Sequence, residues 1–444
     1  MKPPLSLVFL LALAGASGAQ EGAGSLSDET ETLAQIEKLR KQVESLQRQL
    51  EQRADSSGRD AVDLAEKEVE FVPERESASH VLTRPWYQNI DLSGFGAVWL
   101  ADSGRSGTRP DAGFVIKETT LFVEAEVWED MSFFFEVQTN PLQQDHNLAV
   151  RTGEVYAHFH NLLEKFGDDL LGIKVGRIDI PFGEEYLWQD APDNPLISNT
   201  AAYPWLWDEG IALYGRFHGL GWVASVTDGT IARSREDDQE KAVNAKVYGT
   251  PWPPLYLSAS FMKNGDSAAS ALLLGGSLFQ PVGAGAASSA GTSPSDKVDA
   301  FLYEVDARCD LFSRAAFEFS FGQAFVDDAE DAFDRDMTWF SAQSRCDLLA
   351  EKLHAALRYS EIGTYDSSKG YHIGGEFLAG GDEAFGYDAR RLQRFSLGLG
   401  WKITPRAMLK LEAGRDRFEV IDASPFDPDG DDRDFYATEL AMWF

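Results

Sequence analysis

Carboxylate and aromatic side chains are concentrated in one long segment of the chain, residues 179–208. Its acidic residues include Glu184, Glu185, Asp190 and Asp193, and several tryptophans and tyrosines lie among them. A ring of Asp or Glu favours cations, whereas a ring of Arg or Lys favours anions. A connection this long is usually either functional or disordered, and its aromatic content argues against disorder. We therefore expect it to fold inward and act as a charge filter.

Basic side chains on the predicted strands could face these carboxylates. Across a narrow opening, opposite charges would produce a transverse electric field at its narrowest point. An ordinary solvated position explains each cation equally well when it is taken alone. The candidates, with the acid that follows the first of them, are Lys117, Glu118, Lys174, Arg177, Arg358, Arg394 and Lys402.

Other kinds of chemistry find less support in the sequence. There is no Gly-x-Ser-x-Gly, His-Glu-x-x-His or phosphate-binding Gly-Lys motif, so we expect no enzymatic activity. His158 and His160 share a strand face with Glu154, but two histidines with one distant acid are common on a polar wall. The run 427–432 could bind Ca²⁺ through oxygen ligands but lacks a closing bidentate Glu. We expect no metal site and no cofactor.

The elements that would position these residues are strands, and the last one shows the pattern best. Tyr436, Leu440, Met442 and Phe444 fall on one side of a period-2 strand, while Glu439 falls on the other with small residues. An edge strand of a soluble sandwich would alternate in the same way. In a membrane barrel the last strand must pair with the first, so that no edge is left in lipid. We expect the four apolar-face residues to serve barrel closure and assembly.

Connection lengths separate these two alternatives. From residue 89 onward, short connections such as 129–130 and 404–406 alternate with long ones such as 102–112 and 365–389. Short turns on one side and long loops on the other are typical of outer-membrane barrels. The sequence predicts an all-β protein, a transmembrane antiparallel β-barrel of about 16 strands over residues 89–444, with an aqueous lumen.

Three short stretches also resemble a known family. Residues 114–121, 175–183 (with Pro-Phe-Gly at 181–183) and 208–211 are similar to segments of the phosphate-selective porins, the O and P family. The resemblance implies a trimeric, 16-stranded outer-membrane porin that admits small hydrophilic solutes. The family's second strand is rich in arginine, whereas here Lys117 is the only cation and Glu118 follows it. We therefore expect weak selectivity that leans to cations, rather than strict phosphate selectivity.

The N-terminal part of the chain has a different composition. Lys2, the apolar run 5–13 and the small residues before Gln20 predict a signal peptide over residues 1–19, with export to the outer membrane. Residues 54–88 are expected to form a polar linker. Within the segment 20–53, a short coiled coil is predicted over 29–53, and a lone amphipathic helix is the alternative. Its heptad positions a and d are Ile36, Leu39, Val43, Leu46 and Leu50.

Charge and targeting limit the expected partners. The net charge of −32 argues against nucleic acid. We expect outer-membrane lipid, two further copies of the chain, the barrel-assembly machinery acting on the last strand, and peptidoglycan as partners. The peptidoglycan contact defines an alternative function, in which the coiled coil tethers the envelope.

The only two cysteines of the chain, Cys309 and Cys346, each follow an arginine and precede Asp-Leu. An exported protein can form a disulfide. The predicted spacing of two strands, about 10 Å, is too large for a bridge without movement of the backbone.

Overall fold

A computed structural model describes residues 89–102, 112–141, 148–163, 169–202, 207–229, 241–267, 298–311, 314–328, 335–349, 352–364, 371–373, 387–420 and 432–444. The predicted signal peptide (1–19), coiled coil (29–53) and linker (54–88) lie outside these ranges. Almost all of the acidic run 427–432 does as well. No helix within the described ranges has the length and apolar content needed to cross a lipid bilayer.

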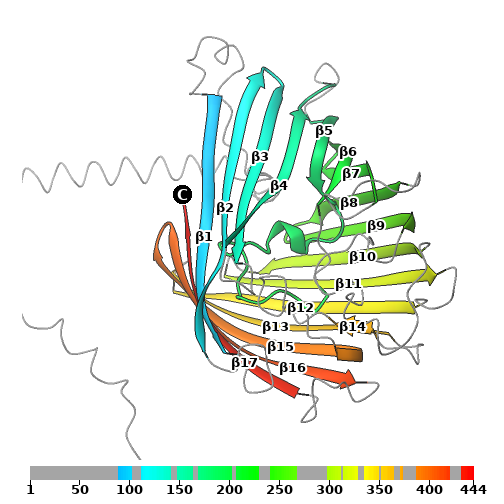
Figure 1. The fold of residues 1–444 in the computed structure, drawn as a ribbon. Helices are drawn as coiled ribbons and strands as arrows, with labels where there is room; N and C mark the ends of the chain where they lie inside the picture. Colours follow the sequence, from blue (N-terminus) through cyan, green and yellow to red (C-terminus); the bar gives the residue numbers. More distant parts are fainter. Residues whose placement is uncertain are drawn as a thin grey trace, which may run out of the picture. The chain divides into compact units, whose positions relative to one another are not determined.

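In the described part of the chain, seventeen strands form one antiparallel sheet. The short β14 pairs with β15, but β13 also pairs directly with β15, so sixteen strands form the closed ring (Figure 1). This confirms the predicted barrel. The strands are β1 (Ile90–Asp102), β2 (Gly113–Trp128), β3 (Met131–Pro141), β4 (Leu148–Phe159), β5 (Gly172–Asp179), β6 (Trp207–Phe217), β7 (Leu220–Thr227), β8 (Ala242–Trp252), β9 (Leu255–Ser267), β10 (Val298–Leu311), β11 (Ala315–Asp328), β12 (Arg335–Leu349), β13 (Leu353–Thr364), β14 (Tyr371–Ile373), β15 (Tyr387–Thr404), β16 (Ala407–Val420) and β17 (Asp432–Trp443).

The two faces of the strands differ in chemistry, as the alternation predicts. On β15, Phe395, Leu397 and Leu399 are exposed, whereas the alternating residues Arg394 and Ser396 are buried. Successive side chains of a strand point to opposite faces, so the apolar set faces outward and the charged set faces the interior. An apolar outer band around a polar interior is the arrangement that a transmembrane barrel requires.

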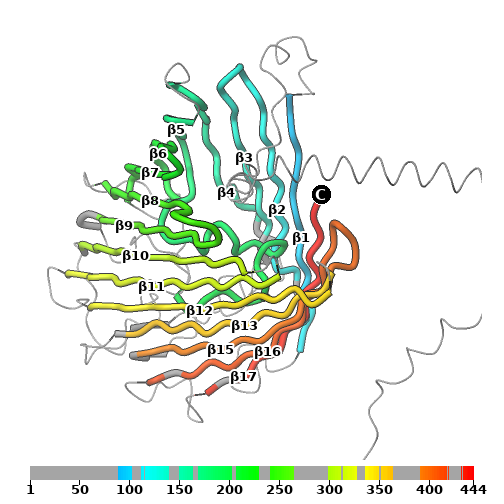
Figure 2. The backbone as a smooth tube through the Cα atoms, turned by 180° about the vertical axis from the view of Figure 1, so that it is seen from behind, coloured from blue at the N-terminus to red at the C-terminus, as the bar shows by residue number. Residues whose placement is uncertain are grey.

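The ring closes between the first and last strands. β1 pairs antiparallel with β17, from Phe95 opposite Trp443 to Asp102 opposite Tyr436. Beyond this register, Gly94 and Phe444 exchange both backbone hydrogen bonds, at 3.3 and 3.0 Å. Figure 2 shows the end of the chain beside β1. The terminal strand therefore has a partner on each side, β16 and β1.

Short turns join the strands at one end of the barrel. Residues 129–130, 218–219, 253–254 and 405–406 link β2 to β3, β6 to β7, β8 to β9 and β15 to β16. The connection between β5 and β6 leaves from the opposite end of the strands and spans residues 180–206. The short-turn end and the opposite end serve below to describe where each residue lies along the barrel axis.

Both cysteines are free. Cys309 lies on β10 and Cys346 on β12, and β11 separates the two strands. The absence of a bridge agrees with the spacing expected from the sequence.

Candidate functional site

The chain between β5 and β6 turns back against the inner wall of the barrel (Figure 1). We call its described part, residues 180–202, the constriction loop, after the role expected from the sequence. Apart from the short 3-10 helix Glu185–Leu187, it has no regular secondary structure. The backbone groups of such a segment must find other partners when they are buried. Side chains of the wall supply many of them.

Three successive carbonyl oxygens of the constriction loop each accept a hydrogen bond from a different cation of the wall. The distances are 3.4 Å from Lys117 Nζ to Ile197 O, 2.6 Å from Arg358 to Ser198 O, and 3.2 Å from Arg394 to Asn199 O. The exposed fractions of the three cations are only 1, 0 and 1 %. These predicted pore cations therefore lie beneath the loop and bind its backbone.

Two residues of β16 bind the same stretch of the loop. Lys410 Nζ donates to the carbonyl oxygens of Ala191 and Leu196, the latter at 3.1 Å. The Glu412 carboxylate accepts hydrogen bonds from the backbone N–H groups of Ile197 and Ser198, at 2.5 and 2.8 Å, and from the Ser198 hydroxyl. Hydrogen bonds to charged groups are the strong ones, so this half of the loop is firmly held.

Ion pairs join these cations to carboxylates of the wall. Lys117 and Lys410 share Glu439 of β17, at 3.1 and 3.0 Å, and all three side chains are buried. Arg394 forms a forked pair with Asp416, at 2.8 and 3.0 Å. A buried charge is tolerated when it is paired and hydrogen-bonded.

Apolar contacts complete the seat of the loop. The inner face of β1 carries Trp99 and Ala101, which pack with Ile197 of the loop and with Phe435 of β17. Nearby, Ala191 of the loop packs in a second cluster with residues of β1 and β17. These contacts of β1 and β17 with the loop are apolar and lie beside the ion pairs of Glu439.

The start of the loop explains the Pro-Phe-Gly motif. Gly183 has φ +68, and a Cβ there would lie 2.3 Å from a carboxylate oxygen of Glu304, so this position requires glycine. Its N–H donates to Ser260 Oγ at 2.9 Å, and its carbonyl accepts from Lys246 Nζ at 2.7 Å. Phe182 packs against Trp339, with 6.3 Å between ring centroids.

Each of the two adjacent glutamates has a different partner. Glu184 pairs with Lys246 at 2.8 Å and accepts a hydrogen bond from the Tyr256 hydroxyl at 2.8 Å. Glu185 is buried and accepts hydrogen bonds from the backbone N–H and the hydroxyl of Thr200, so it holds the two arms of the loop together. Burial raises the pKa of Glu185 above its ordinary value, because desolvation outweighs the attraction of Arg358.

The remaining two loop acids are more accessible. Asp193 is exposed and Asp190 is partly exposed. Burial raises the pKa of Asp190 well above its ordinary value, and the nearby carboxylates of Glu118, Glu136 and Asp193 raise it further. Asp193 is therefore the exposed acid of the loop, whereas the surroundings of Asp190 disfavour its charged form.

A β-bulge explains how the adjacent residues Lys117 and Glu118 can both serve this site. On β1, Ala97 pairs with Glu118 and Val98 pairs with Ile116, so Lys117 is the extra residue. A bulge re-aims side chains at the point where it interrupts the ladder. Both side chains therefore face inward, with 3.8 Å between their charged atoms.

The other three predicted wall cations are placed elsewhere. Lys174 lies on the inner face of β5, 4.8 Å above the Tyr156 ring. Arg177 lies on the outer face of β5 with the exposed Val175, two residues before it, and forms an ion pair with Glu209. The prediction that Arg177 faces the lumen is therefore wrong. Lys402 lies two residues before the end of β15, at the short-turn end.

Sequence reasoning missed several residues that hold the loop. Five of them form hydrogen bonds with the loop backbone: Lys246, Ser260, His354, Lys410 and Glu412. Lys246 also forms an ion pair with Glu184. Each is an ordinary polar residue on the inner face of an alternating strand, so no local pattern distinguishes it. Only strand register and the path of the loop bring these residues together.

Comparisons with known proteins give the fold. No protein-family model matches the sequence, and no curated protein sequence matches it significantly. Among solved structures, the outer membrane channel DcaP of Acinetobacter baumannii is similar over 80 % of this chain and 97 % of its own, with a TM-score of 0.54 and 12 % identity. The anion-selective porin from Comamonas acidovorans is similar over 80 % of this chain and 99 % of its own, with a TM-score of 0.52 and 12 % identity.

A third similar structure is the trimer form of OmpT, an outer membrane protein of Vibrio cholerae. It is similar over 80 % of this chain and 99 % of its own, with a TM-score of 0.51 and 12 % identity. At these identities the likeness concerns the fold. The chain has the β-barrel fold that these outer-membrane channels and porins share.

Proposed function

We propose that the chain is an outer-membrane porin, a water-filled channel for the passive diffusion of small hydrophilic solutes and ions. The observation that carries this proposal is the constriction loop, which is bound to the inner wall of a closed barrel with an apolar outer face. A sixteen-stranded barrel is too wide for side chains alone to fill. A loop held against its wall narrows the path without closing it, and no catalytic step is required.

The accessible charges favour weak selectivity for cations. Anion or phosphate selection, which the sequence resemblance implies, would need basic groups that a solute can reach. Lys117, Arg358 and Arg394 are covered by the loop and engaged with its carbonyl groups. Among the four loop acids, Asp193 is exposed, whereas Glu184 is paired with Lys246 and Glu185 is buried, so we assign the sign of the preference mainly to Asp193.

The proposal includes a homotrimer in the outer membrane, reached through the predicted signal peptide and the barrel-assembly machinery. Support comes from the similar OmpT structure, which is a trimer form. Mass measurement of the detergent-solubilised protein by light scattering tests the assembly, and a mass of one barrel would contradict it.

Planar-bilayer recording tests the function. The purified, folded protein should give stable conductance steps, and heat-denatured protein in the same detergent should give none. In a salt gradient, the reversal potential should have the sign of a modest cation preference. The absence of stable steps from folded protein would reject the channel, whereas an anion-selective reversal potential would reject the assigned selectivity only.

A further inference from the structure

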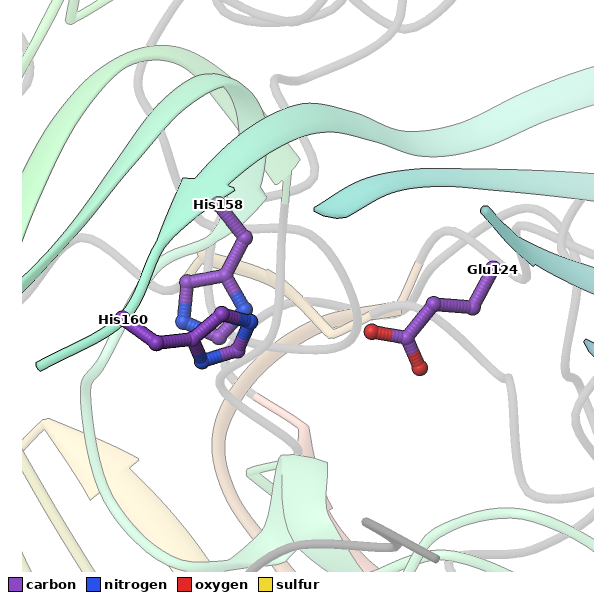
Figure 3. A group of neighbouring side chains, drawn as sticks. All are labelled: Glu124, His158 and His160. Atoms are coloured by element: carbon purple, nitrogen blue, oxygen red, sulfur yellow. The ribbon is translucent and has the colours of Figure 1, made fainter. Parts of the chain in front are cut away.

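Two histidines and a glutamate lie together on the inner wall, outside the constriction loop. His158 is near the end of β4, His160 directly follows that strand, and Glu124 is on β2. One ligand-type atom from each lies within 4.8 Å of the others. Figure 3 shows the two imidazole rings packed together and the Glu124 carboxylate directed at them. The ring centroids are 3.5 Å apart.

The strands themselves produce this arrangement. Residues two apart on an extended chain point to the same face, so His158 and His160 project together. Ser132 on β3 lies opposite His158 in the ladder, between the histidines and β2. Its hydroxyl donates to Glu124 Oε1 at 2.9 Å and lies 3.3 Å from His160 Nε2. The carboxylate and one imidazole are therefore already oriented by a shared neighbour.

We propose that Glu124, His158 and His160 form a binding site for a divalent transition-metal ion of the Zn²⁺ type. Imidazole nitrogen and carboxylate oxygen are ordinary zinc ligands, and three protein ligands leave one position for water or a solute group. Two nitrogen donors disfavour Ca²⁺ and Mg²⁺, which take oxygen ligands. The sequence suggested Glu154 as the acidic partner, but Glu154 accepts a hydrogen bond from the Asp179 N–H at 2.9 Å instead.

Neighbouring groups supply the support that such ligands require. The Tyr214 hydroxyl is hydrogen-bonded to His158 Nε2, and the His160 backbone N–H donates to Asp130 O at 2.9 Å. Contacts of this kind fix ring orientation, and their loss commonly weakens metal binding by about 10–100-fold. Lys174, the ladder partner of His158, has its ammonium group over the Tyr156 ring.

The proposed site is at the short-turn end of the barrel. Glu124 is close to the turn 129–130, and Asp130 of that turn bonds the His160 backbone. The constriction loop leaves β5 from the opposite end, after Asp179. The bound ion would therefore sit at the mouth of the barrel, separate from the narrowing, and its binding can be measured whether or not the barrel conducts.

Zn²⁺ titration of the folded full chain tests the site, using protein that carries no polyhistidine tag. An excess of Ca²⁺ suppresses binding of Zn²⁺ to carboxylates alone without competing for imidazole. We expect one saturable Zn²⁺ per chain under these conditions. His158→Gln, His160→Gln and Glu124→Gln should each weaken binding at least about tenfold. His218→Gln is the matched control, since His218 is exposed on the turn between β6 and β7.

Equal Zn²⁺ affinity in all variants, or no saturable site in the native chain, would overturn the proposal. If a variant does not fold, a spectroscopic measurement on the native chain tests the site instead. Bound Cu²⁺ should then show hyperfine coupling to two imidazole nitrogens by electron paramagnetic resonance. A spectrum with oxygen ligands alone would reject the site.

Discussion

The Arg358 guanidinium donates a 2.6 Å hydrogen bond to the carbonyl oxygen of Ser198, although 160 residues separate them in the chain. The same guanidinium also bonds Asn194 Oδ1 of the loop at 2.9 Å and Gln343 of the wall at 2.6 Å. One fully buried cation thus joins two points of the constriction loop to the barrel. Its charge stabilises the position of the loop rather than meeting solutes directly.

Replacing Arg358 should therefore loosen the loop. Arg358→Ala removes the charged donor from the Ser198 carbonyl, which keeps the Asn194 Nδ2 donor, and from Asn194 Oδ1, which keeps the Leu196 N–H. The expected cost is about 1.5–3 kcal/mol for each lost hydrogen bond to the charged group. An effect of this size should raise the frequency of open-loop events by about tenfold or more. Single-channel recordings would show larger and noisier conductance.

Lys402→Ala is the matched control, because Lys402 is a cation of the inner face that lies at the short-turn end. Its conductance should equal that of the native protein. If both variants behave alike, the anchoring role of Arg358 is wrong. Arg358→Lys should give an intermediate result, since an ammonium group lacks the forked geometry of guanidinium.

The accessible acids of the loop should control ion preference. Asp193→Asn, alone and together with Asp190→Asn, removes negative charge from the loop and should lower the cation-to-anion permeability ratio. The reversal potential in a salt gradient measures this ratio. Asp310→Asn, which removes a charge near a short turn on β10, is the control. A double variant with an unchanged reversal potential would contradict the assigned filter.

Docking of the loop should depend on pH through Asp190. The docked loop raises the pKa of this acid, so Asp190 holds its proton more tightly there than in an undocked loop. Its stabilising contribution is fully present below the ordinary pKa, about 3.9, and is lost as pH rises through the raised pKa. Open-loop events should become more frequent as pH rises through the raised pKa of Asp190, and Asp190→Asn should reduce this dependence. An identical pH profile in the variant would exclude Asp190 as the cause.

Closure of the ring should depend on the backbone of Phe444. Deletion of Phe444 removes both hydrogen bonds to Gly94 and should lower the yield of folded barrel in refolding from denaturant. Phe444→Leu keeps both backbone bonds and should restore most of the yield. The molecules of the deletion variant that do fold should conduct normally. Equal yields for the deletion variant and the native protein would show that this pairing is dispensable.

Period-2 alternation and the sequence of short and long connections were sufficient to predict the barrel. Each strand has one lipid-facing and one inward-facing side, so the alternation can be recognised within a single strand. On β15 and β17, exposed Leu397 and Tyr436 alternate with buried neighbours. The coiled coil and the signal peptide remain predictions. The inward path of residues 180–202 was also expected, since a long aromatic-rich segment needs a surface to bury against.

Individual contacts of the site could not be predicted in the same way. The bulge at Lys117 adds one residue to β2 and changes which side chains face inward, a change that the local alternation does not reveal. Arg177 faces outward because it shares a strand face with Val175. Glu412 and its partner Ile197 in the loop are separated by 215 residues in the sequence. Only closure of the ring brings them into contact.

The attachment points of the constriction loop have a consequence for how the protein is made. The loop follows β5, yet its second half is bound by Arg358 on β13, Arg394 on β15, Glu412 on β16 and, through shared carboxylate Glu439, β17. These strands come last in the chain, and the ring closes only when β17 pairs with β1. Native docking of the loop therefore waits for the final part of the chain, so that narrowing of the lumen is one of the last events of biogenesis, coincident with sealing of the wall.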